Sequence, residues 1–87
     1  MIKITKELLS RWFDKVNKEF FNNELRKTDF VITHNNSRFG QFRPRTWTIE
    51  ISTHWIRTER DYMNTLIHEC CHCYVRQKYG YRVQSHG

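Results

Sequence analysis

Apolar side chains near the start of the chain recur at the spacing of an amphipathic helix. Between residues 5 and 25 the recurring set is Leu8, Leu9, Trp12, Phe13, Val16 and Phe20. A spacing of three and four residues places such side chains on one face of a helix. Thr5 is a residue type that favours the N-cap, and the run 21–23 has turn character. The pattern predicts a helix over residues 5–25 with one face on a core.

The middle of the chain changes to an alternation of apolar and polar residues. Trp47, Ile49 and Ile51 alternate with polar side chains, which is typical of a half-buried strand. Shorter β-prone runs precede this segment at residues 30–32 and 38–42, and the residues between them favour a turn. Short connections favour antiparallel neighbours. We therefore expect a small, mostly antiparallel sheet.

A second helix is predicted from about Glu59 to Tyr79. Thr58 and Asp61 have the spacing of a capping box, and Gly80 suits the position after a helix end. One broad arc of this helix is apolar and is expected to face the core: Tyr62, Met63, Leu66, Ile67, Cys70, Cys73 and Tyr74. The chain contains no internal repeat and no linker-like tract. The order helix, sheet, helix predicts one α+β domain over residues 1–87.

The predicted second helix contains the pattern H-E-x-x-H, from His68 to His72. Residues four apart lie on the same helix face, so both imidazoles can reach one Zn²⁺ at about 2.0–2.1 Å. Glu69 is rotated by about 100° from His68, which puts its carboxylate near the water that the metal would bind. It can act there as a general base in peptide hydrolysis. His68, Glu69 and His72 lie opposite the apolar arc, which argues against histidines that serve only to fill the core.

A catalytic zinc needs a third protein ligand and an open position for water. His86 follows the helix, where a returning tail can close the site, and His34 and His54 are the alternative third ligands. Two other interpretations remain open at this point. Zinc can be purely structural, or the chain can be a basic nucleic-acid-binding module with an incomplete or structural zinc site.

Charge and cysteine content bear on the partners and the compartment. Lys and Arg number 15 against 9 Asp and Glu, so the net charge is +6, which suits either solubility or an acidic partner such as DNA. Trp47 and Trp55 can either pack in the fold or, beside Arg38, Arg43, Arg45 and Arg57, stack on single-stranded bases. The three cysteines, Cys70, Cys71 and Cys73, are too crowded for a disulfide framework. No run approaches the roughly 20 apolar residues of a membrane span, and no secretory signal is visible. We expect a cytoplasmic protein.

Several segments together resemble the SprT-like (Spartan-type) family of zinc metallopeptidases. The similar segments are Phe21-Asn22-Asn23-Glu24-Leu25, Phe39-Gly40, Ile49-Glu50-Ile51-Ser52, Thr65-Leu66-Ile67-His68-Glu69-Cys70-Cys71-His72 and Ser85-His86-Gly87. The resemblance implies a minimal zincin-like fold, a zinc site of His68, His72 and His86, and Glu69 as the catalytic acidic residue. It also implies a protein or peptide substrate and proteolysis linked to DNA, on proteins crosslinked to it, which would place the protein near the nucleoid. Family members continue beyond the H-G segment, so we expect either a fragment or a minimal form.

Overall fold

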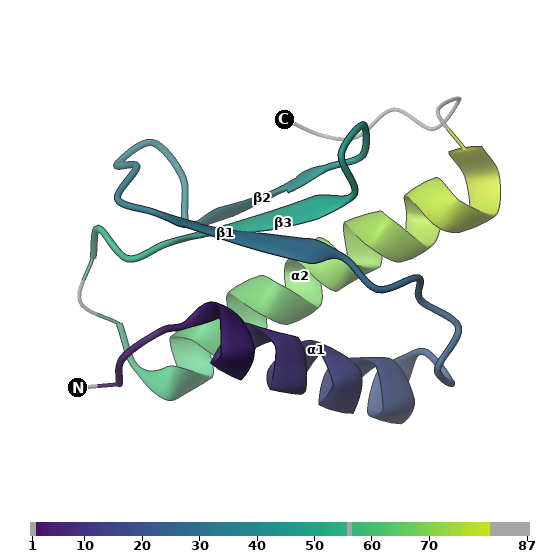
Figure 1. The fold of residues 1–87 in the computed structure, drawn as a ribbon, viewed down its shortest axis with the longest axis horizontal. Coiled ribbons are helices and arrows are strands. Elements are labelled where there is room, and N and C mark those ends of the chain that lie inside the picture. The colour runs from purple at the N-terminus through teal and green to yellow at the C-terminus, as the bar shows by residue number, and fades with distance from the viewer. Residues whose placement is uncertain (1, 56, 81–87) are drawn as a thin grey trace.

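The computed structural model describes residues 2–55 and 57–80, which form two helices and one three-stranded sheet (Figure 1). In chain order the elements are α1 (Lys6–Phe20), β1 (Asp29–Thr33), β2 (Gly40–Arg43), β3 (Thr48–Ser52) and α2 (Glu59–Tyr79). The predicted α+β class is confirmed. α1 is shorter than predicted, because Asn22 and Asn23 take left-handed backbone angles, with φ of 58° and 61°, and a helix does not continue through them.

The sheet is mixed, so the expectation of a mostly antiparallel sheet is wrong for one of its two pairings. The strand order is β1-β3-β2. β3 pairs with β2 in antiparallel fashion, as its short connection predicts. β1 instead pairs with β3 in parallel, with Phe30 opposite Ile49. The short connection between β1 and β2 does not make them antiparallel partners, because these consecutive strands are not neighbours. They lie on opposite edges of β3, whose five residues are all buried.

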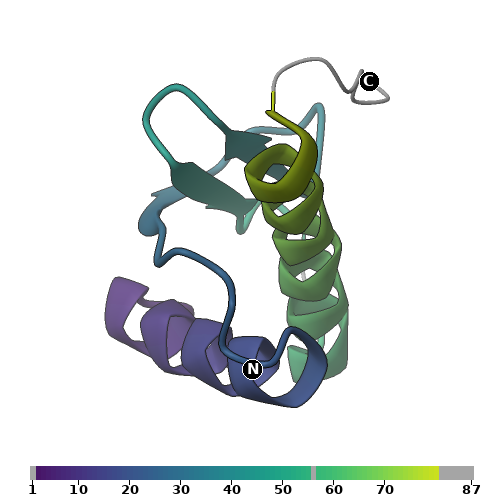
Figure 2. The same cartoon turned by 90° about the vertical axis from the view of Figure 1, so that its right-hand side faces the viewer.

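Both helices pack on the same face of the sheet, and the core lies between these two layers (Figures 1 and 2). Phe13 of α1 meets Phe30 of β1 edge-on, with ring centroids 5.9 Å apart. The fully buried apolar side chains come from α1, β3 and α2: Leu9, Phe13, Val16, Ile49, Ile51, Leu66, Cys70 and Cys73. The predicted packing role of Cys70 and Cys73 is thereby confirmed. Burial raises the pKa of both thiols, that of Cys70 to about 12, so both remain protonated at neutral pH.

The predicted caps hold the helix ends in place. The Thr5 hydroxyl accepts a hydrogen bond from the backbone N–H of Leu8 at 3.1 Å. At α2 the capping box is complete: the Thr58 hydroxyl accepts from Asp61 N–H, and the Asp61 carboxylate accepts from Thr58 N–H, each at 3.1 Å. Hydrogen bonding to the Asp61 carboxylate, first from the Thr58 backbone N–H and then from the Thr58 hydroxyl, lowers the pKa of Asp61. Among the described residues, neither helix has the length and apolar character that crossing a bilayer requires.

Candidate metal centre

The two histidines of the H-E-x-x-H motif converge on the outer face of α2. Nε2 of His68 lies 3.2 Å from Nε2 of His72, and the two ring planes stand at 84°. Two nitrogens bound to one tetrahedral zinc at about 2.0–2.1 Å would lie roughly 3.3–3.4 Å apart. The observed separation therefore fits a shared zinc ion with a small adjustment of either ring.

The side of α2 that carries Glu69 is buried, whereas the helical wheel predicts that it is exposed. Its exposed fraction is 5 %, whereas His68 is exposed and His72 is half-buried. The wheel places Glu69 on an exposed face because it cannot see that β2 covers this position. The carboxylate is thus held at the junction of α2 and the sheet, beside the histidine pair rather than out in solvent.

Gly40 is the residue through which β2 reaches α2. A Cβ atom built on Gly40 would lie 2.7 Å from Cγ2 of Thr65 and 3.5 Å from Oε2 of Glu69. Such closeness leaves no room for a side chain on β2 at this point. Reasoning from composition and periodicity missed this role of Gly40, although a glycine inside a β-prone run is a signal of close backbone approach.

Within the described residues, β2 has one backbone edge beside Glu69 that no strand pairs with. It is an edge strand of the described sheet, and the carbonyl of Phe39 accepts a hydrogen bond from Ser52 N–H of β3 at 2.9 Å. In an antiparallel pair, residues whose N–H and C=O point toward the partner strand alternate with residues whose N–H and C=O point away from it. The N–H and C=O of Gly40 and of Phe42 consequently point away from β3, toward the open edge.

The third ligand suggested by the sequence, His86, lies outside the described residues. Within residues 2–55 and 57–80, no group of three or more His, Cys, Asp or Glu side chains is arranged to hold a metal ion. The alternative ligands His34 and His54 therefore do not join the motif. His34 lies 3.0 Å from the Thr53 hydroxyl, and His54 packs edge-on against Trp55.

The aromatic residues flanked by arginines are largely engaged in packing. Trp47 donates from its indole N–H to the carbonyl of Arg26 at 3.0 Å and meets Phe42 edge-on. Trp55 packs against Phe39, with ring centroids 4.7 Å apart. Of the neighbouring arginines, Arg43 pairs with the buried carboxylate of Glu50, and Arg57 is bonded within the fold. These contacts favour the packing interpretation of both tryptophans.

A family comparison gives the arrangement its context. The model of the SprT-like family matches residues 9–87, which include nearly all of α1, the whole sheet and α2.

The chain belongs to the SprT-like family.

The predicted resemblance is thus confirmed, and this SprT-like chain is a metallopeptidase-like domain of a family associated with zinc. Comparison with curated proteins found no match, and neither did comparison with solved structures.

Proposed function

We propose that this domain is a zinc-dependent endopeptidase in which His68 and His72 hold the metal, His86 is the third ligand and Glu69 is the general base. The proposal rests on the 3.2 Å separation between the Nε2 atoms of His68 and His72. The buried carboxylate of Glu69 lies on the same helix turn, against the sheet. Membership of a metallopeptidase-like family supports it. Zinc, when bound, would supply a Lewis acid that polarises the scissile carbonyl and acidifies water.

The residues around this centre suit a peptide substrate. The open edge of β2 presents the backbone groups of Gly40 and Phe42, and an extended peptide can add to such an edge through main-chain hydrogen bonds. Gly40 adjoins the Glu69 carboxylate, so a peptide bound there would run past it. Glu69 would accept the proton of the attacking water and return it to the leaving amine.

Separate measurements of metal content and of cleavage test this proposal. Glu69→Gln should keep about one zinc per chain and lower the rate of casein cleavage by roughly 10²–10⁴-fold, because the general base is lost. Glu19→Gln, an exposed glutamate on α1, is the matched control and should be fully active. Cleavage by Glu69→Gln at the wild-type rate would refute the assigned role.

Metal content alone tests the ligand set. His68→Ala and His86→Ala should each lose zinc, whereas His54→Ala, an exposed histidine outside the motif, should retain it. Zinc that is retained in His86→Ala would show that another residue completes the site. A purely structural metal would be favoured by two results together: the variants unfold when they lose zinc, and the zinc-loaded wild type cleaves no substrate.

The narrower part of the proposal is that the substrates are proteins bound or crosslinked to DNA. Its support is the net charge of +6 and the family resemblance. Binding to single- and double-stranded DNA should weaken steeply with rising salt, and DNA should accelerate cleavage of a protein crosslinked to it. DNA binding that survives chelation, with no cleavage under any condition, would instead favour the nucleic-acid-binding module with an incomplete zinc site.

A further inference from the structure

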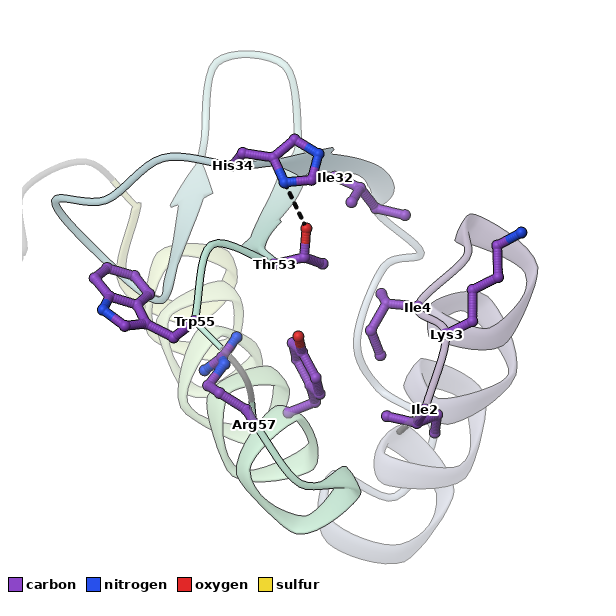
Figure 3. Close-up of a pocket in the computed structure, with 9 residues that line it drawn as sticks. Ile2, Lys3, Ile4, Ile32, His34, Thr53, Trp55 and Arg57 are labelled. Atoms are coloured by element: carbon purple, nitrogen blue, oxygen red, sulfur yellow. Dashed lines mark hydrogen bonds between the residues drawn. The ribbon is translucent and has the colours of Figure 1, made fainter.

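A second concave site lies at the carboxyl ends of the parallel strands β1 and β3, between the segment that precedes α1 and the start of α2 (Figure 3). This edge of parallel strands is where ligand crevices commonly form. The pocket has a volume of about 440 Å³, within the range of small-molecule sites. No residue of the H-E-x-x-H motif lines it. Its apolar walls are Ile2, Ile4, Ile32, Trp55 and Tyr62.

The charged side chains that line the pocket are basic. Lys3 and Arg57 line it together with His34, and no Asp or Glu is among the described lining residues. Basic side chains around a partly enclosed apolar space attract an anion more strongly than the same charges on an open surface. The charge of the pocket is therefore complementary to an anionic ligand.

Two of the three guanidinium nitrogens of Arg57 are bonded within the fold. Its Nη1 donates to the Thr65 hydroxyl at 2.8 Å and its Nη2 to the Ser52 carbonyl at 2.9 Å, while the guanidinium stacks 4.2 Å from the centroid of the Tyr62 ring. Its Nε–H is buried and has no hydrogen-bond partner among the described residues. Because Nε has almost no accessible surface, Arg57 acts on a ligand through its positive charge and not through this donor.

The imidazole of His34 lies at the edge of the pocket, against Thr53. The Thr53 hydroxyl is 3.2 Å from the carbonyl oxygen of Thr33 and 3.0 Å from Nδ1 of His34, the contact dashed in Figure 3. The Thr53 hydroxyl is thereby engaged within the fold, which leaves Lys3 as the cationic donor for a ligand.

We propose that this pocket binds a small monocarboxylate that carries an apolar alkyl or aryl group. The apolar group would lie against the isoleucines and Trp55, and the carboxylate would pair with Lys3 in the positive field of Arg57. A singly charged carboxylate suits the site better than a phosphate, because both Nη atoms of Arg57 already donate within the fold, which leaves few donors for the oxygens of a phosphate.

Titration of the full chain with 4-phenylbutyrate, followed by the NMR shifts of backbone amides and of the Trp55 indole, tests the proposal. We expect saturable shifts at Ile4, Thr53 and Trp55 with a dissociation constant of order 1 mM, as ligand size allows. The neutral analogue 4-phenylbutanol should bind at least fivefold more weakly. Equal binding of the alcohol, or shifts that do not saturate, would overturn the proposal.

Paired variants locate the site. Ile32→Trp should fill the pocket and abolish the titration, whereas Val31→Trp, an exposed position on the same strand, should not. Lys3→Gln should weaken binding roughly two- to fivefold, as for a partly exposed ion pair, and Lys6→Gln, which does not line the pocket, should leave it unchanged. If Ile32→Trp does not fold, the two lysine variants test the proposal. Equal affinities of Lys3→Gln and Lys6→Gln for 4-phenylbutyrate would overturn the pairing of Lys3 with the carboxylate.

Discussion

Adding one methyl group at Gly40 tests whether the contact between β2 and α2 is as tight as the structure indicates. In Gly40→Ala the new Cβ would lie 2.7 Å from Cγ2 of Thr65 and 3.0 Å from the Glu50 carbonyl oxygen. Thr65 cannot rotate away cheaply, because its hydroxyl accepts from Arg57 and donates to the carbonyl of Asp61 at 3.1 Å. The strand or the helix must therefore shift.

The expected magnitude follows from two opposing effects. Overpacking a filled site costs roughly 1–3 kcal/mol, whereas Gly-to-Ala exchange stabilises by roughly 0.4–1 kcal/mol through the unfolded chain. The net decrease in the free energy of unfolding should be about 1–2 kcal/mol. For a domain of this size that corresponds to a Tm lower by roughly 4–16 °C.

Urea denaturation of a double-mutant cycle isolates the contact. Thr65→Ser removes the offending Cγ2 but keeps the hydroxyl, so the double variant Gly40→Ala with Thr65→Ser should recover much of the loss, and the coupling energy should exceed about 0.5 kcal/mol. A neutral Gly40→Ala, or a cycle with no coupling, would refute the close packing of β2 on α2 at this point.

Three further predictions follow from the described contacts. The pKa of Asp61 is lowered in the fold from its unfolded value of 3.8, so the stability that ionised Asp61 contributes is present above pH 3.8 and is lost as the pH falls through the lower folded pKa. Asp61→Asn should therefore flatten the acid-denaturation profile in that range, and an unchanged profile would contradict the capping box. Asn17→Ala should lower the free energy of unfolding by about 2–3 kcal/mol, because the buried side-chain amide bonds both the N–H and the carbonyl of Leu25 at 3.0 Å. Urea denaturation measures this loss, with Asn36→Ala at an exposed position as the control. With a thiol reagent at pH 8, only Cys71 should react rapidly in the folded chain, because Cys71 is exposed whereas Cys70 and Cys73 are buried and protonated. Rapid reaction of all three thiols would show that the core opens.

The elements encoded by local patterns could be predicted from the sequence. The Thr58–Asp61 capping box, the apolar arc of α2 and the four-residue spacing of His68 and His72 depend only on helix geometry and on residues within one or two turns. The same geometry places the two imidazoles on one face wherever the helix lies. The predicted histidine pair is therefore a local property of α2.

Contacts between distant segments could be known only from the tertiary structure. That β1 pairs with β3 in parallel depends on which strand occupies each edge of β3, and neither periodicity nor loop length decides this. Glu69 is covered because Gly40, which lies 29 residues earlier in the chain, lets a strand approach the helix. The pocket likewise requires the segment before α1 to meet the ends of two strands and the start of α2. The helices and the motif were determined by neighbours along the chain, whereas the surroundings of the carboxylate were determined by packing between layers.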